Sequence, residues 1–343
     1  MSTITAAATY PINGGGSPAF NSPAGSAAYS GTAYSGTFIP ALWSGKLAQK
    51  FYAATVFGEI ANTDWQGDIT GMGDTVIINT IPTVTINSYS IGQNLAYEVP
   101  APSTISLVIN KGKYFGVNVN NVLELQAKPK LMDMFTNDAA MQMKIAIDKD
   151  VMYSTFNQGA AANQGATAGA ISGGYNLGVD TAAVTLTASN ILSSITALSS
   201  VLDESNVPET DRWLIITPTE RQILMQSNLA QAQFMGDAAS VLRNGKIGMI
   251  DRFTVYVSNL VPRGAAGKTW MNPNTGTDAT SASAVKRHAV IAGHKSAITF
   301  ASQIAKVESL QNPNDFGQLV RGLNVYGTQV AQTNGLALLV AAG

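Results

Sequence analysis

The chain has 343 residues, of which only 12% are Asp, Glu, Lys or Arg, about half of the roughly 25% usual for soluble globular proteins. Its 20 basic and 21 acidic side chains give a net charge of −1, which argues against a strongly basic nucleic-acid binder. With no cysteine and two histidines, the composition excludes disulfide frameworks, cysteine nucleophiles, thiolate metal sites and multi-histidine metal centres. The length predicts about two domains.

The missing charge is concentrated in three places. Residues 1–45 and the residues after Arg321 carry no charged side chain, and between residues 151 and 202 the only one is Asp180. The first segment mixes Gly, Ser, Ala and Pro with aromatic rings, a composition that suits burial at an interface. Two interpretations stay open for it: a flexible tail, or an extended arm that orders against neighbouring subunits.

Membrane and secretion signals are not expected. The longest nearly apolar run, residues 336–342, is far shorter than the ~20 residues needed to cross a bilayer. The N-terminus lacks the basic start and apolar core of a secretion signal. We therefore expect no membrane partner, and synthesis in the cytoplasm.

In chain order, the first predicted element is a short amphipathic helix over residues 40–59. Strands are predicted next over residues 74–87 and 104–120, because apolar residues in each share one parity. Together they predict a long two-stranded ribbon with an open tip. An isolated ribbon is marginal in water, so we expect it to lie on another surface.

The ribbon and its tip carry the side chains that we expect to contact other subunits. They are Tyr89, Tyr97 and Glu98 in the connection, and Lys111 and Lys113 in the second strand.

Residues 128–156 form the strongest predicted helix, roughly 40 Å long. Apolar residues recur every four positions, at Phe135, Ala139, Met143, Ile147 and Val151, which indicates a packed face. Lys144 and Asp148 are predicted to be i,i+4 partners on the exposed face.

The rest of the chain predicts a mixed α/β part. Residues 158–178 are a Gly/Ala/Asn/Gln/Ser tract, interpreted as a loop or partly ordered insertion. Helices are expected over 189–203 and 218–227, the second begun by a capping box at Thr217 and Glu220. Strands are expected over residues 213–216, 253–257, 289–292, 298–301, 319–329 and 336–340, the last two around a turn at 334–335.

Catalytic patterns are missing from the sequence. It contains no phosphate loop, no G-x-S-x-G elbow and no H-E-x-x-H helix. His294 and Ser296 are expected in an exposed turn, and His288 at a solvated strand entry. Asp148 and Asp150 fall on different faces of one helix, so they do not form a paired-carboxylate site. We expect no enzyme, cofactor or metal site.

Five stretches together resemble the major capsid proteins of tailed bacteriophages, of the Hong Kong 97-type fold. They are the charge-free residues 1–38, the ribbon 64–120 with its strings GDTVII (73–78) and INKGKY (109–114), the helix 128–156, the strings RWLIITP (212–218) and 248–259, and VRGLNVYG (320–327).

The resemblance implies an α+β fold with five parts. They are an N-terminal arm and short helix (1–60), an extended β-ribbon loop (61–120), a peripheral domain with a spine helix at 128–156 (121–180), an axial α/β domain (181–300) and return strands of the peripheral domain (301–343). In the arm, Tyr29, Tyr34 and Phe38 are expected to contact other subunits.

The resemblance also implies what the protein does. Its copies would form the pentamers and hexamers of an icosahedral shell around double-stranded DNA, in a virion assembled in the bacterial cytoplasm. We expect a separate scaffolding protein and a portal as partners, a decoration protein as a further candidate, no sequence-specific DNA binding and no N-terminal cleavage. Crosslinking through Lys111 or Lys113 is not expected.

Two other classes of protein stay open. A tail-tube or surface-layer protein shares the low charge but should be nearly all β, without the helix at 128–156. A soluble hydrolase should be a discrete monomer whose activity depends on His294 or Ser296.

Overall fold

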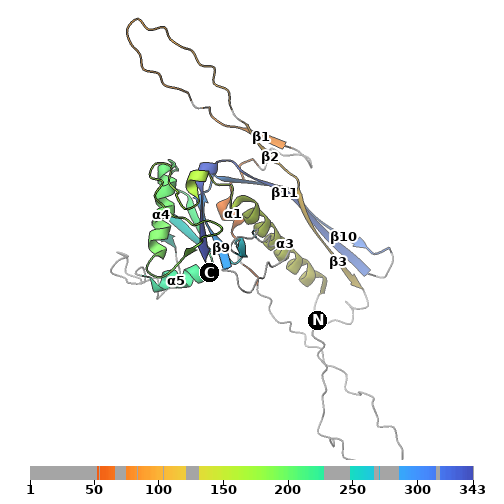
Figure 1. Cartoon of the computed structure of the whole chain (residues 1–343). Helices are drawn as coiled ribbons and strands as arrows, with labels where there is room; N and C mark the ends of the chain where they lie inside the picture. The colour runs from red at the N-terminus through yellow and green to blue at the C-terminus, as the bar shows by residue number, and fades with distance from the viewer. Residues whose placement is uncertain are drawn as a thin grey trace, which may run out of the picture. The chain divides into compact units, whose positions relative to one another are not determined.

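The computed structural model describes residues 52–53, 55–65, 75–82, 84–102, 104–120, 131–227, 248–265, 270, 286–313 and 317–342. They form a mixed α+β fold (Figure 1), as predicted. The helices are α1 (Phe57–Ile60), α3 (Leu131–Thr155), α4 (Ile191–Glu204) and α5 (Pro218–Gln226), with 3-10 turns η2 (Ala161–Asn163) and η5 (Thr333–Gly335). The strands are β1 (Thr75–Asn79), β2 (Thr104–Val108), β3 (Lys111–Asn120), β4 (Val184–Thr185), β5 (Arg212–Ile216), β6 (Met249–Ile250), β7 (Phe253–Val257), β8 (Arg263–Ala265), β9 (Lys286–His294), β10 (Ile298–Gln311), β11 (Gly317–Val330) and β12 (Leu336–Ala342).

A seven-stranded sheet has the order β4-β12-β9-β5-β7-β6, with β8 paired to β9. Its central strands are buried along nearly their whole length. Beyond the charged residues at the starts of β5 and β9 they are therefore largely apolar runs instead of alternating patterns. Strand β5 is parallel to β7 and antiparallel to β9. The last strand, β12, pairs with β9 and not with β11. It therefore lies in the seven-stranded sheet, most strands of which come from residues 181–300.

Helices cover both faces of this sheet. On one face Leu214 and Ile216 of β5 pack in a cluster with Ile195 and Leu198 of α4. On the other, Trp213 and its neighbours pack in a cluster with the C-terminal half of α3. Alternate residues of one strand therefore enter two different cores, because successive side chains of a strand point to opposite faces.

The second sheet has three antiparallel strands in the order β10-β11-β3, and it packs on α3. The predicted ribbon is wrong in its extent. Strand β1 pairs with β2 over only five residues, Thr75↔Val108 to Asn79↔Thr104, and residues 84–87 are not in a strand. The pairing is interrupted at residues 109–110, and β3 then pairs with β11 instead of continuing the ribbon with β1.

A glycine allows this change of partner. Where β2 crosses β11, a Cβ atom at Gly327 would overlap the Val108 carbonyl oxygen. Behind this crossing lies a small buried cluster, on which Val76 and Ile78 of β1 pack. Its members are Leu107, Ile109, Ala301 and Val325. The predicted parity of the apolar residues is therefore confirmed, although the strand that it described is broken in two.

Helix α3 confirms the predicted helix over the described residues, but its packed face is shorter than the pattern indicates. Ile147 and Val151 are buried, whereas Phe135, at the start of the same stripe, is 42% exposed. Asp148 is not an exposed partner of Lys144, because it is completely buried. The burial of α3 is thus confined to its C-terminal half.

Several other expectations are confirmed. Helix α4 buries Ile191, Ile195, Leu198 and Leu202, and α5 begins with the predicted capping box. Of the predicted helix 40–59 only α1 is helical among the described residues, and residues 1–51 lie outside them.

The tract 158–178 is ordered. It buries Ala168 and Leu177, and its Gln164 forms a bridge with Leu338 of β12.

The predicted solvated entry of β9 is wrong. His288 is buried and contacts the Glu220 carboxylate, and burial lowers its pKa. Arg287 is also buried. It forms a 2.7 Å ion pair with Asp180 and stacks on the Trp270 ring. The one charge in residues 151–202 thus has a buried cation as its partner.

Among the described residues, no helix is long and apolar enough to cross a membrane.

A series of Asp substitutions along α3 tests how its packing changes along the helix. Ile147 is 3% exposed, so Ile147→Asp buries an unpaired charge, and we expect it to cost about 3–5 kcal/mol and prevent folding. Met143→Asp, at a half-buried position, should cost less, and Met141→Asp, at a position 46% exposed, least. Urea unfolding followed by circular dichroism measures the series. Equal losses at Met141 and Ile147 would contradict the packing described here.

Candidate assembly surfaces

Two carboxylates of α3 hold separate parts of the molecule together. The first, Asp148, is 0% exposed and accepts hydrogen bonds from the backbone N–H groups of Val56 (3.2 Å) and Phe57 (3.0 Å) at the start of α1. It thereby supplies acceptors that a four-residue helix lacks at its N-terminus. Burial raises the pKa of this carboxyl to about 6, against the two amide hydrogen bonds, which lower it.

The second carboxylate, Asp150, joins α3 to the three-stranded sheet. It accepts a hydrogen bond from the Tyr326 hydroxyl at 2.8 Å and forms a 3.1 Å ion pair with Lys111. Burial and this acceptor raise the pKa of Tyr326. Tyr326 and Lys111 are directly opposite each other on β11 and β3. Residues 111, 113, 115 and 117 of β3 therefore share the face that meets α3, and residues 112, 114 and 116 lie on the other face.

The connection between β1 and β2 is the first candidate assembly surface. Its tip turns at Ser90–Gln93, where the Gln93 N–H donates to the Ser90 carbonyl (3.1 Å) and Gly92 has φ = +89°. Lower down, the Thr85 N–H donates to the Glu98 carboxylate at 3.1 Å. These bonds hold the two limbs to each other, and we call residues 80–102 the extended loop.

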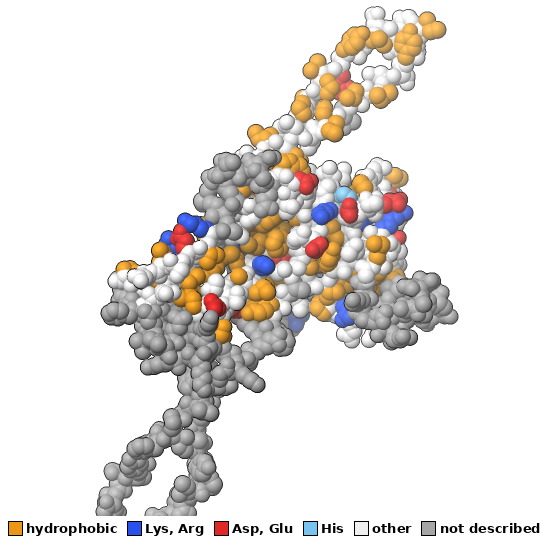
Figure 2. Space-filling model, turned by 180° about the vertical axis from the view of Figure 1, so that it is seen from behind, with side chains coloured by type: hydrophobic (Ala, Val, Ile, Leu, Met, Phe, Trp, Pro, Cys, Tyr) orange, Lys and Arg blue, Asp and Glu red, His pale blue; other side chains and the backbone are white. Residues whose placement is uncertain are grey.

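Apolar side chains line the extended loop, and they are exposed (Figure 2). Tyr97 is 88% exposed and Ile91 is 97% exposed. The other exposed apolar residues are Ile81, Val84, Ile86, Tyr89, Leu95 and Val99. Glu98 is the only charged residue of the loop. Exposed apolar side chains gathered in this way are typical of a surface that contacts another molecule.

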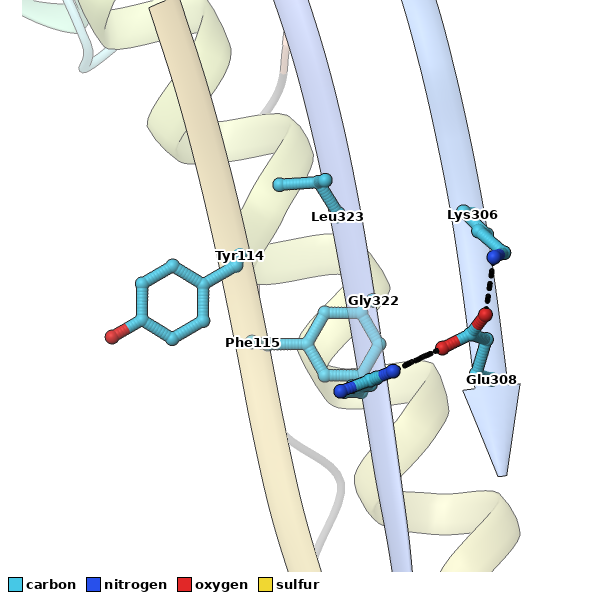
Figure 3. Close-up of a pocket in the computed structure, with 7 residues that line it drawn as sticks. Tyr114, Phe115, Lys306, Glu308, Gly322 and Leu323 are labelled. Atoms are coloured by element: carbon cyan, nitrogen blue, oxygen red, sulfur yellow. Dashed lines mark hydrogen bonds and ion pairs between the residues drawn. The ribbon is translucent and has the colours of Figure 1, made fainter. Parts of the chain in front are cut away.

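The outer face of the three-stranded sheet, turned away from α3, is the second candidate surface (Figure 3). Tyr114 of β3 is 83% exposed, and its neighbour Leu323 on β11 is 40% exposed. Beside them Glu308 binds the Arg321 guanidinium through two donors (2.9 and 2.6 Å) and also pairs with Lys306. Both cations lower the pKa of Glu308. Together with Phe115 and Gly322, these residues line a hollow of about 360 Å³.

The predicted contact residues fall into three groups. Tyr89, Tyr97 and Glu98 lie on the extended loop, where both rings are exposed and the Glu98 carboxylate accepts from the Thr85 N–H. Lys111 and Lys113 lie on the face of β3 that meets α3, and Lys111 is already paired within the chain. Tyr29, Tyr34 and Phe38 lie outside the described residues.

The sequence analysis did not single out Tyr114, Leu323 or Arg321. A signal for Tyr114 existed in the pattern Gly112-Lys113-Tyr114-Phe115-Gly116. There, one large aromatic side chain stands between two glycines on the same face of a strand. Leu323 and Arg321 are recognised only through their register with β3 and β10.

The residues suggested for a hydrolase form a local turn. The His294 ring nitrogen lies 2.7 Å from the Ser296 hydroxyl and accepts the Ser296 backbone N–H at 3.2 Å. Burial lowers the pKa of His294. Among the described residues, no group of three or more His, Asp or Glu side chains could hold a metal ion.

Comparison with solved structures places this fold among those of phage particles. This chain matches a structure of Mycobacterium phage Che8 with a TM-score of 0.67 and 24% identity, over 88% of this chain and 96% of that chain. The capsid of cyanophage P-SCSP1u matches with a TM-score of 0.63 and 14% identity, over 89% and 94% of the two chains. The mature capsid of bacteriophage PhiM1 matches with a TM-score of 0.62 and 13% identity, over 88% and 91%. No curated protein matches.

A family model described as phage capsid protein matches residues 103–339, which is more than half of the chain. The chain belongs to this family of phage capsid proteins. It is a structural protein of the virion, not an enzyme.

Asp148 makes stability depend on pH in a direction that can be checked. Its carboxyl has a pKa of about 6 in the folded protein and about 4 when unfolded. The folded state therefore binds the proton more tightly, so this stabilising contribution is complete below about pH 4 and is lost as the pH rises through about 6. Relative to Asp148→Asn, we expect the unmodified chain to lose on the order of 2–3 kcal/mol between about pH 4 and about pH 7.

Denaturant unfolding of the unmodified chain and of Asp148→Asn across this pH range measures the difference between their free energies of unfolding. The contributions of the other carboxyl groups cancel in this difference. Parallel pH profiles would show that Asp148 does not titrate as described.

Proposed function

We propose that the chain is the major capsid protein of a tailed bacteriophage, with the Hong Kong 97-type fold. Its copies form the pentamers and hexamers of an icosahedral shell that encloses double-stranded DNA. In this proposal residues 1–38 are the N-terminal arm, the extended loop lies over a neighbouring subunit, and α3 is the spine helix of the peripheral domain. The sheet of β5, β7 and β9 is the core of the axial domain.

The observation that carries the proposal is the extended loop. Its apolar side chains are mostly exposed, and some are nearly completely so. Burying them at about 25 cal/mol per Å² of apolar surface would favour association strongly. A shell supplies the covering surface, because each subunit meets several others. The near-zero net charge also fits a wall that encloses DNA without binding it by sequence.

Partners and location follow from the same proposal. The main partner is the chain itself, within the virion. A scaffolding protein and a portal are further proposed partners, with a decoration protein as an additional candidate. Synthesis and assembly take place in the cytoplasm of the host bacterium.

A tail-tube or surface-layer protein is the alternative, and α3 argues against it. That class was expected to be nearly all β, whereas α3 alone has 25 residues. Electron microscopy of the expressed chain separates the classes. We expect closed shells tens of nanometres across. Open tubes or planar arrays would support the alternative, and only isolated particles of one chain would contradict both.

Hydrogen exchange tests whether other subunits order the extended loop. In the isolated chain, amides of residues 84–102 should exchange with little protection, because few of them bond within the chain. In assembled particles the same amides should be protected. Helix α4, which is buried within the subunit, is the internal control and should be protected in both. Strong protection of the loop in the isolated chain would contradict the proposal.

A further inference from the structure

Strand β10 forms one edge of the three-stranded sheet, beside β11 (Figure 3). Near its start, Asn62 occupies the outer edge: its N–H donates to the Ile298 carbonyl (2.7 Å) and its carbonyl accepts from the Phe300 N–H (2.9 Å). From residue 304 to the end of β10 at Gln311, no strand in the described part of the subunit pairs with this edge. A long edge without proline is a template on which another strand can pair.

The strand register shows which backbone groups of this free edge point outward. In an antiparallel strand, the N–H and C=O groups of alternate residues point to the same side. Before the irregularity between Ser302 and Ile304 the outward residues include Phe300, and the one-residue shift there changes the parity. Beyond the shift, the backbone groups of residues 305, 307 and 309 therefore point away from β11.

The side chains of this edge are complementary to themselves around Val307. Lys306 precedes Val307 and Glu308 follows it on the outer face, and Val307 itself is 62% exposed. Lys306 pairs with Glu308 within the strand, yet its side chain is still 67% exposed. A two-fold contact brings one patch against its own copy, so the patch must complement itself. If two copies of β10 met antiparallel at Val307, Lys306 of each would lie opposite Glu308 of the other.

The charges also select this register over its neighbours. Directly opposed residues point to the same side of a sheet, so each face must pair with the same face when all copies present one face outward. The nearest other registers that satisfy this condition are centred on Lys306 or on Glu308. Each would place two like charges directly opposite each other, which is destabilising. Val307 is therefore the favoured centre.

We propose that β10 of each subunit pairs antiparallel with β10 of a second copy, across a two-fold axis at Val307. The two three-stranded sheets then form one continuous sheet. Backbone hydrogen bonds form at residues 305, 307 and 309, the two Val307 side chains pack on each other, and Lys306 of each copy pairs with Glu308 of the other. The inference rests on the proposed function, because an icosahedral shell has two-fold axes. It adds a subunit contact that does not involve the extended loop.

A single cysteine at the proposed axis tests the pairing without background, because the chain has no cysteine. Val307→Cys places two thiols on opposed residues, whose Cα atoms are about 5.5 Å apart in such a pair, within the range that a disulfide spans. Leu310→Cys is the matched control. Leu310 is an exposed apolar residue of the same strand (42%), but its counterpart would lie roughly 20 Å away. After oxidation of assembled particles, a denaturing gel should show dimers for Val307→Cys and only a trace for Leu310→Cys.

Charge variants in the Val307→Cys chain test the ion pairs across the axis. Lys306→Glu alone, or Glu308→Lys alone, brings like charges together and should lower the dimer yield about fivefold. Co-expression of the two variant chains puts unlike charges opposite each other wherever different chains meet. Random mixing should therefore restore about half of the lost yield. A yield that does not recover would overturn the assigned ion pairs.

The remaining outcomes separate this pairing from the proposed function. Normal particles in which Val307→Cys gives no more dimer than Leu310→Cys overturn the pairing alone. If Val307→Cys prevents assembly, electron cryomicroscopy of particles of the unmodified chain decides. We then expect two β10 strands about 4.8 Å apart across the axis, and a wider separation overturns the pairing. An unmodified chain that forms no particles contradicts the proposed function, and the pairing with it.

Discussion

The C-terminal half of α3 is the element on which the rest of the subunit depends. Its apolar side packs against the seven-stranded sheet, and two carboxylates extend from it to other elements. Asp148 holds the start of α1, and Asp150 holds both β3 and β11. One helix thus connects both sheets to α1. A disturbance here would affect both sheets and α1, whereas substitutions in the exposed N-terminal half of the helix should have smaller effects.

The low charge of the chain has a structural consequence. The few charges within the body mostly have close partners, such as Asp180 with Arg287 and Asp150 with Lys111. The extended loop, by contrast, exposes apolar residues with a single carboxylate among them. Burying such a segment against another subunit costs little charge desolvation, which would amount to several kcal/mol for each unpaired ion. A low cost of desolvation at subunit contacts suits a capsid protein, because its copies contact one another in the shell.

Local patterns predicted the elements well where one physical cause acts alone. The capping box at Thr217 and Glu220, the apolar face of α4 and strand β7 all appear as expected. The sequence-based predictions failed where residues far away in the sequence determine strand pairing or burial. The parity of residues 104–120 is correct, yet the strand breaks, because Gly327 lets β2 cross β11 and the next residues pair elsewhere. His288 is buried at a position that its charged neighbours in the sequence made look solvated, and Glu220, far away in the sequence, is its polar partner there. For the candidate assembly surfaces, the sequence pointed to the extended loop and missed the exposed Tyr114.

By itself the sequence determined the kind of protein: one low in charge, without catalytic motifs, and resembling a capsid subunit. Periodicity and composition are local properties, so they can be read without coordinates. Only the tertiary structure decided which carboxylate is buried, which strand joins which sheet and which face of β3 stays open. Those outcomes depend on residues far apart in the chain, such as Asp148 with Phe57 and Tyr114 with Leu323, and their proximity is created by folding alone.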